Sequence, residues 1–162
     1  MAIQERHPPS LLERAIALAV EAHAGHWVRA DRPYILHPLG VMARMETIPE
    51  RIVAILHDTV ENEGDRVSFA RLRQEGFPED IVRAIDCLTR RDGEPYADMI
   101  ERIAPNPLAR RVKLADLADN LDLLRQAELT PVEFEGLQMR LRAWHRLRHA
   151  GFDEPADRLM RV

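Results

Sequence analysis

Two imidazoles and two carboxylates stand where the sequence otherwise predicts buried helix faces. They are His37, His57, Asp58 and Asp116. Ionisable groups inside a core must be paired, hydrogen-bonded or bound to a metal, because an unpaired buried charge costs several kcal/mol or more. Nitrogen and oxygen ligands of this kind suit Mn²⁺, Fe²⁺, Zn²⁺ or Mg²⁺. The set therefore predicts a site for one divalent ion, with open positions for water and a phosphate oxygen.

Each of these residues also has a purely structural interpretation. A single histidine on an apolar helix face is most often a satisfied core residue, and Asp116 alone could be a buried acceptor between helices. The more specific signal is the pair His57-Asp58, followed by the carboxylate of Glu61 one turn later. On a continuous helix Glu61 shares the face of His57. There it could orient an attacking water or shuttle its proton.

An all-α scaffold is predicted to position these side chains. Apolar residues recur with helical period between proline and capping signals, and no stretch keeps the period-two alternation of a strand. Helices are predicted over residues 10–25, 37–46, 49–62, 68–76, 78–88, 96–103, 106–126, 130–151 and 154–161. Residues 26–33 are predicted to form a loop. The prediction is a single domain over residues 1–162, with eight or nine helices.

The composition narrows the class of protein. The chain has 162 residues, 46% of them hydrophobic, and its net charge is −4 without a block of basic residues. These values disfavour a dedicated nucleic-acid or membrane surface. The one cysteine, Cys87, lies in an apolar segment, which is typical of a core thiol in a reducing compartment. With no apolar run long enough for a signal or membrane helix, the sequence predicts a cytoplasmic globular protein.

Four segments, in this order and at these separations, resemble one known family. They are Ala22-His23-Ala24-Gly25, Pro33-Tyr34-Ile35-Leu36-His37-Pro38, Leu56-His57-Asp58-Thr59-Val60-Glu61-Asn62, and Lys113-Leu114-Ala115-Asp116 with Asn120. The chain resembles the HD-type metal-dependent phosphohydrolases, and among them the RelA/SpoT-like (p)ppGpp hydrolases. The nearest likeness is to small hydrolase-only members related to the metazoan SpoT homologue. It extends from Leu11 to about Leu124.

The resemblance implies a function and a role for each residue. It implies an HD bundle in which His37, His57, Asp58 and Asp116 hold one Mn²⁺-like ion. The expected reaction is removal of the 3′-pyrophosphate from the guanosine alarmone of the stringent response. Glu61 would assist that reaction, with Asn62 beside it in the catalytic segment. The expected contacts to the nucleotide substrate are Arg29, His26 and Asn120.

Four positions depart from the family pattern. Asn62 stands where relatives have aspartate, and asparagine cannot take a proton. Val28 replaces an arginine that meets the nucleotide, Arg29 replaces the following lysine, and Leu117 replaces another arginine. Two alternatives therefore stay open: a nucleotide 5′-monophosphatase of the HD class, and a catalytically inactive module that binds a nucleotide.

Further histidines and a tryptophan have two interpretations each. His23 lies on the apolar face of the first predicted helix, which favours a supporting role over direct catalysis. Trp27 either stacks on a base or covers the core. His145 and His149 have the spacing of a metal pair, but an arginine-rich solvated helix face is favoured.

Overall fold

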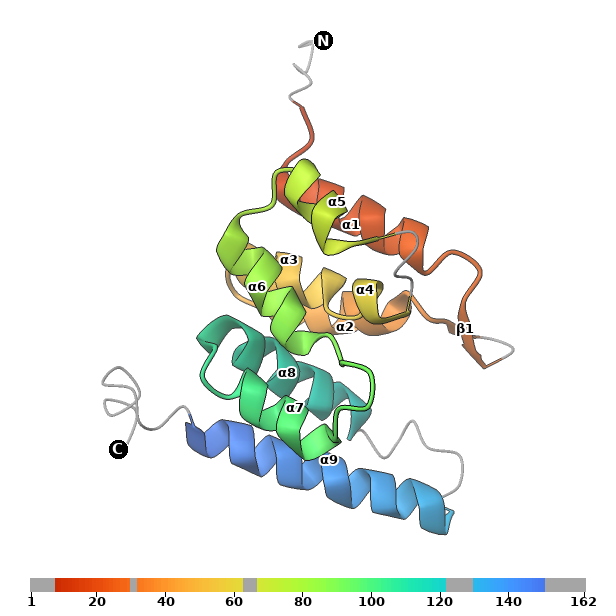
Figure 1. The fold of residues 1–162 in the computed structure, drawn as a ribbon. Helices are drawn as coiled ribbons and strands as arrows, with labels where there is room; N and C mark the ends of the chain where they lie inside the picture. The colour runs from red at the N-terminus through yellow and green to blue at the C-terminus, as the bar shows by residue number, and fades with distance from the viewer. Residues whose placement is uncertain (1–7, 30–31, 63–66, 122–129, 151–162) are drawn as a thin grey trace.

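The computed structural model describes residues 8–29, 32–62, 67–121 and 130–150, without the side chains of Arg29, Glu61 and Asn62. Its helices are α1 (Leu11–Ala22), α2 (Leu36–Ala43), α3 (Ile48–Leu56), α4 (Thr59–Asn62), α5 (Phe69–Gln74), α6 (Glu79–Leu88), α7 (Tyr96–Ile103), α8 (Pro107–Asn120) and α9 (Pro131–Ala150). Two short strands, β1 (Trp27–Arg29) and β2 (Arg32–Pro33), complete the described elements. The predicted all-α class is confirmed (Figure 1).

Local capping signals fix most of the helix starts. The hydroxyl of Ser10 accepts the amide of Glu13, whose carboxylate returns to the Ser10 amide, forming a capping box at α1. Thr130 and Glu133 make the same reciprocal pair at α9. At α8 the side chain of Asn106 accepts the amide at the third helical position. These starts were predictable because each cap lies within a few residues of the helix that it begins.

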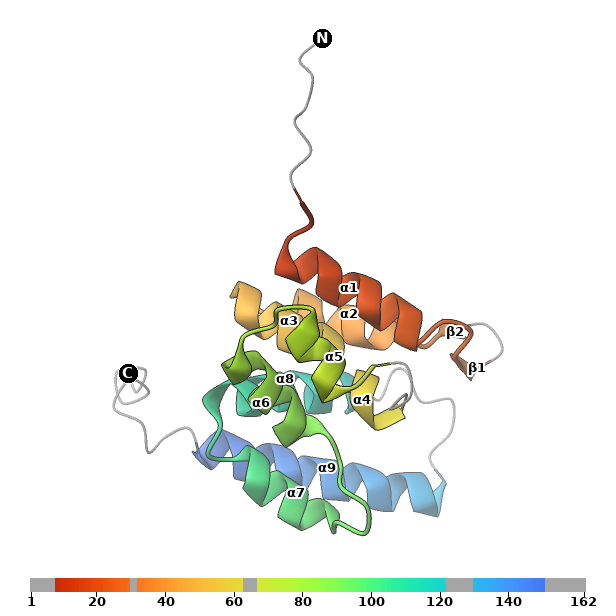
Figure 2. The same cartoon turned by 45° about the horizontal axis from the view of Figure 1, so that its top comes forward.

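Helix α3 forms the centre of the bundle. It packs against α1, α2, α6 and α8, and its residues from Ile52 to Leu56 are all nearly inaccessible. A helix that is apolar on all sides must be surrounded by other elements. Figures 1 and 2 show α1 on one side of α3, and α9 at the opposite edge of the molecule beyond α8. The carboxyl end of α3 therefore delivers its last residues into the interior.

The predicted continuous helix over residues 49–62 is wrong at its middle. Helix α3 ends at Leu56, His57 and Asp58 form a turn, and α4 begins at Thr59. The Thr59 hydroxyl donates to the Leu56 carbonyl at 2.9 Å, and His57 Nδ1 donates to the Ala54 carbonyl at 2.7 Å. Side chains that bind main-chain carbonyls locally compete with the helical ladder. Residues 49–62 therefore form two helices separated by a turn, where the sequence had predicted one.

The predicted loop over residues 26–33 contains a small antiparallel hairpin. Trp27 pairs with Pro33, and Arg29 pairs with Arg32. Strands of three and two residues are too short to display an alternating pattern. Trp27 is 58% exposed, so the interpretation that it covers the core is wrong.

Other boundaries shift by a few residues or lie outside the description. Helix α2 ends at Ala43, earlier than predicted. Helix α8 ends at Asn120 and Leu121 forms a turn, so the predicted helix to residue 126 is wrong at Leu121. Residues 122–126 and the predicted helix over 154–161 lie outside the described part. His145 and His149 are exposed, as a solvated face requires. None of the described helices has the length and apolar character needed to cross a membrane.

Candidate metal centre

The candidate metal centre forms where the ends of three helices meet. His37 lies in the first turn of α2, His57 and Asp58 follow the end of α3, and Asp116 lies near the end of α8. Ligand atoms of His37, His57 and Asp58 all lie within 4.8 Å of one another. Asp116 Oδ1 lies 3.2 Å from His37 Nε2 and 3.8 Å from His57 Nε2. Three of the predicted ligands therefore form one group, and Asp116 adjoins its two histidines.

The cluster is largely removed from solvent. His57, Asp58 and Asp116 are each at most 6% exposed, and the His37 side chain is 15% exposed. Isolated charges at this depth are strongly disfavoured. Each carboxylate must therefore have further partners.

Asp58 is held from the side of α1 and the hairpin. His23, at the end of α1, donates Nε2–H to Asp58 Oδ1 at 3.1 Å. The hydroxyl of Tyr34, which follows β2, donates to Asp58 Oδ2. The supporting role favoured for His23 agrees with this contact. Its Nδ1 is buried and makes no hydrogen bond within the described part of the protein.

Asp116 is held by two residues of its own helix. Lys113, one turn earlier, donates to Oδ2 at 2.7 Å. Asn120, one turn later, donates Nδ2–H to Oδ1 at 2.7 Å and to the Asp116 carbonyl at 3.0 Å. The Lys113 side chain is 14% exposed, so its charge is poorly screened. These contacts fix the orientation of the carboxylate toward the histidines.

The two histidines are each held through Nδ1. His57 donates to the carbonyl of Ala54, and His37 donates to Asp119 Oδ2 at 3.0 Å. A carbonyl or carboxylate oxygen can only accept, so in both rings Nδ1 carries a proton. In both rings it is therefore Nε2 that faces Asp116.

The surroundings keep the two candidate carboxylate ligands ionised. Burial by itself would raise the pKa of Asp58, but His57 and the hydrogen bonds from His23 and Tyr34 lower the pKa well below its usual range. Burial likewise opposes ionisation of Asp116, and the charge of Lys113 with the hydrogen bond from His37 outweighs it, again lowering the pKa.

The pKa of His37 is shifted in the opposite direction, upward. Burial favours its neutral form, whereas the hydrogen bond and charge of Asp116 and the hydrogen bond to Asp119 raise its pKa. All three candidate groups are thus tuned by near neighbours, which is common at functional sites.

The arrangement fits a cation. His57 Nε2 and Asp116 Oδ1 lie 3.8 Å apart, which is too far for a hydrogen bond between them. Imidazole nitrogens and carboxylate oxygens are suitable ligands for a divalent ion.

The remaining predicted residues occupy different positions. His26 is half-buried in the hairpin entry, where its carbonyl accepts the Tyr34 amide at 2.9 Å. Asn120 supports Asp116 as described above. Glu61 and Asn62 end α4, one turn past the His57-Asp58 turn, and Arg29 ends β1; their side chains lie outside the described part. Their catalytic and substrate-binding roles stay predictions.

Comparison with known proteins gives a consistent relationship. The chain is 32% identical over 129 residues to a probable GTP pyrophosphokinase of Mycobacterium leprae, a match that covers 72% of this chain and 16% of the relative. It is 27% identical over 154 residues to the guanosine-3′,5′-bis(diphosphate) 3′-pyrophosphohydrolase of Aquifex aeolicus, covering 84% of this chain and 21% of that protein. It is 31% identical over 126 residues to the bifunctional (p)ppGpp synthase/hydrolase RelA of Mycobacterium tuberculosis, covering 72% and 17%. No protein-family model matches the chain.

A solved structure has the same fold. A metazoan orthologue of SpoT that hydrolyses ppGpp superposes with a TM-score of 0.70 at 21% identity, covering 89% of both chains. This chain is an HD-type member of the RelA/SpoT family. The match spans only 16–21% of the length of the three curated relatives above.

Four groups that hold the candidate ligands in place were not predicted from the sequence. Tyr34, Lys113 and Asp119 each bind a predicted ligand through a side chain, and Ala54 does so through its carbonyl. Lys113 carried a usable signal, because it precedes Asp116 by one helical turn. For Asp119 and Tyr34 the partner is distant in sequence, so only the fold reveals the contact.

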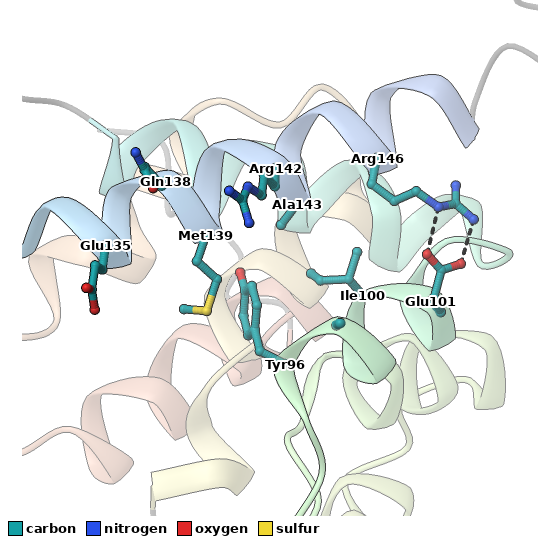
Figure 3. A pocket seen from close by; sticks show the side chains of 10 residues that line it. Tyr96, Ile100, Glu101, Glu135, Gln138, Met139, Arg142, Ala143 and Arg146 are labelled. Atoms are coloured by element: carbon teal, nitrogen blue, oxygen red, sulfur yellow. Dashed lines mark hydrogen bonds and ion pairs between the residues drawn. The ribbon is translucent and has the colours of Figure 1, made fainter. Parts of the chain in front are cut away.

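A separate cavity of about 470 Å³ lies between α7 and α9 (Figure 3). Its walls include Tyr96, Ile100 and Met139, and Glu101 forms an ion pair with Arg146 at its edge at 2.6 Å. None of the predicted site residues lines it. Its mainly apolar wall lacks the convergent imidazoles and carboxylates of the metal centre, so we assign the chemistry to the centre.

Proposed function

We propose that this chain is a metal-dependent phosphohydrolase that removes the 3′-pyrophosphate from a guanosine polyphosphate of the (p)ppGpp type, in the cytoplasm. The observation that carries the proposal is the buried convergence of two imidazoles and two carboxylates, each held by a further group. The names of the relatives, which make or hydrolyse this nucleotide, support the substrate class.

One divalent ion would be held by the two imidazoles and two carboxylates of the centre. These ligands are His37, His57, Asp58 and Asp116. Mn²⁺ is the ion expected, with Fe²⁺, Zn²⁺ and Mg²⁺ as alternatives that accept the same ligand types. When bound, such an ion supplies Lewis-acid chemistry, lowering the pKa of water and offsetting negative charge on a phosphoryl group.

The reaction requires a proton acceptor and a proton donor from the chain. Water attacks the phosphorus attached to the 3′ oxygen, and the bond between that phosphorus and the 3′ oxygen breaks. The products are pyrophosphate and the nucleoside 5′-diphosphate, whose 3′ oxygen takes a proton. We assign the proton transfer to Glu61, because it follows the ligand pair by about one turn and carries a carboxylate. Asn62 can contribute hydrogen bonds there but cannot carry the proton.

The hairpin is the proposed contact surface for the nucleotide. Arg29 would pair with phosphate oxygens through charge-assisted hydrogen bonds, and His26 and Asn120 complete the proposed contacts. Val28 is 53% exposed and offers no charge where relatives have arginine. The exposed indole of Trp27 is placed on the same strand and is suited to stacking on a base.

The test is a product analysis with Mn²⁺ and a nucleotide panel containing ppGpp, GTP and nucleoside 5′-monophosphates. We expect GDP and pyrophosphate from ppGpp, resolved by anion exchange. Orthophosphate from a monophosphate, with ppGpp intact, would instead support the monophosphatase. Saturable binding without any product would support the inactive module. His145→Ala, a change on the exposed face of α9, is the matched control for His57→Ala.

A further inference from the structure

Asp119 occupies a position that the predicted ligand set does not explain. It lies in the last turn of α8 and is 5% exposed. Its Oδ2 accepts the Nδ1–H of His37 at 3.0 Å, and its Oδ1 lies 3.5 Å from an Arg44 nitrogen. The Arg44 side chain is 47% exposed, so water weakens that ion pair. The contact to His37 is the more buried of the two.

The geometry separates Asp119 from the ligands themselves. The Nδ1 atom of His37 points to Asp119, and its Nε2 atom points to Asp116, 3.2 Å away. Asp119 therefore touches the side of the imidazole ring that points away from the candidate ion. It can act on that ion only through His37.

We propose that Asp119 is a positioning residue, which fixes the tautomer and the orientation of His37 for metal binding. This inference rests on the proposed metal centre. A neutral imidazole carries one N–H, and a carboxylate can only accept it, so Asp119 holds the proton on Nδ1. Metal binding then needs only the Nε2 proton, which faces Asp116, to leave, and the Nε2 lone pair is directed at the ion. The negative charge of Asp119 also makes His37 a more basic ligand.

The two histidines of the centre differ in the kind of group that accepts their Nδ1–H. His57 obtains the same tautomer from a main-chain carbonyl three residues earlier, within its own helix. His37 depends on a side chain 82 positions away in sequence. Substitution can remove the support of His37, whereas the support of His57 persists with any residue at position 54 that keeps the backbone.

The experiment is calorimetric titration of the metal-free full chain with Mn²⁺. Asp119→Ala should weaken Mn²⁺ binding by about 10- to 100-fold, the usual effect of losing an outer hydrogen-bond partner. Asp119→Asn keeps the shape but removes the charge, and its amide can turn either an oxygen acceptor or an NH2 donor toward Nδ1, so it should also bind Mn²⁺ more weakly than wild type. In a His37→Ala background, Asp119→Ala should cause no further loss, because its effect is carried by that imidazole.

The matched control is Glu50→Gln. Glu50 is another buried carboxylate, 6% exposed, but it accepts the amides of Glu46 and Thr47 and pairs with Arg111. Its substitution should lower thermal stability and leave the Mn²⁺ affinity unchanged. A comparable loss of affinity in Glu50→Gln would show that general loosening of the fold explains the result, and would overturn the proposal.

The outcomes distinguish this inference from the proposed function. Equal Mn²⁺ affinity in wild type and Asp119→Ala overturns the role of Asp119 and leaves the metal centre intact. A full additional loss in the His37→Ala background also overturns it. A wild-type chain that binds no Mn²⁺ overturns both the metal centre and the role of Asp119.

Discussion

Two partly buried charge networks in this HD domain differ in whether their hydrogen bonds are complete. One surrounds Arg102, whose guanidinium binds both oxygens of Glu94 and the carbonyls of Asp86, Cys87 and Thr89, at 2.6–3.0 Å. An arginine has five N–H donors, and here five bonds are made to acceptors. This network joins α7 to the end of α6 and has no capacity left for a ligand.

The metal centre has the opposite character. It gathers buried carboxylates and imidazole nitrogens, and the gap between His57 Nε2 and Asp116 Oδ1 contains no hydrogen bond at 3.8 Å. Asp58 and Asp116 remain ionised despite burial. A saturated network stabilises the fold, whereas an acceptor-rich one is suited to take up a cation. The difference teaches that the balance of donors and acceptors, rather than burial of charge, marks the functional site.

The largest expected effect comes from removing a ligand. His57→Ala should lose both bound metal and turnover, with the rate of pyrophosphate release falling by more than ~100-fold, beyond the usual cost of losing an outer partner. Initial rates and elemental analysis of the same preparations measure both. Retained metal with a normal rate would show that His57 is not a ligand, and would contradict the contrast between the metal centre and the Arg102 network.

Glu61→Gln should separate chemistry from metal binding. The amide cannot transfer a proton, so turnover should fall by ~10²-fold or more. Bound metal should stay at the wild-type level, because Glu61 is not a predicted ligand. Elemental analysis showing lost metal would instead move Glu61 into the ligand set.

Arg102→Met should affect only the fold. The substitution removes the donors of three main-chain carbonyls, so the free energy of unfolding should fall by about 2 kcal/mol. Urea unfolding measures this loss, and Mn²⁺ affinity should not change. The nearby exposed Arg91→Met is the control, with an expected change within about 0.5 kcal/mol. Loss of Mn²⁺ affinity in Arg102→Met would show that the Arg102 network also contributes to metal binding, and would contradict this division of roles.

The smallest expected effect is a pH dependence within the Arg102 network. Hydrogen bonds from Arg102 lower the pKa of Glu94 from an ordinary 4.5 to about 2. A lowered pKa gives stability that is present above pH 4.5 and is lost as the pH falls toward 2. The stability difference between wild type and Glu94→Gln should therefore shrink over that range. The acids of the metal centre titrate in both proteins and cancel in the difference. A difference that stays constant with pH would contradict this account.

The sequence predicted the helices, and candidate ligands that lie close together in the fold, better than the contacts that hold these side chains; that they bind a metal stays a prediction. Ser10, Thr130 and the apolar run into His57 are local signals, so the helices that they begin or end were predictable. The turn at residues 57–58 was not, because Thr59 prefers a carbonyl bond over helix continuation only in this setting. Asp119 and Tyr34 reach ligands 82 and 24 positions away. Such partner choices are set by packing and leave no periodic pattern.

The most direct test of the central claim, an open centre that binds one ion, is the metal content of the chain after exposure to Mn²⁺ and removal of free ion. Wild type and Arg102→Met should each retain close to one ion per chain. A His57→Ala, Asp116→Ala double variant, checked for folding by circular dichroism, should retain almost none. Metal-free wild type, or equal loading of the folded double variant, would contradict the account.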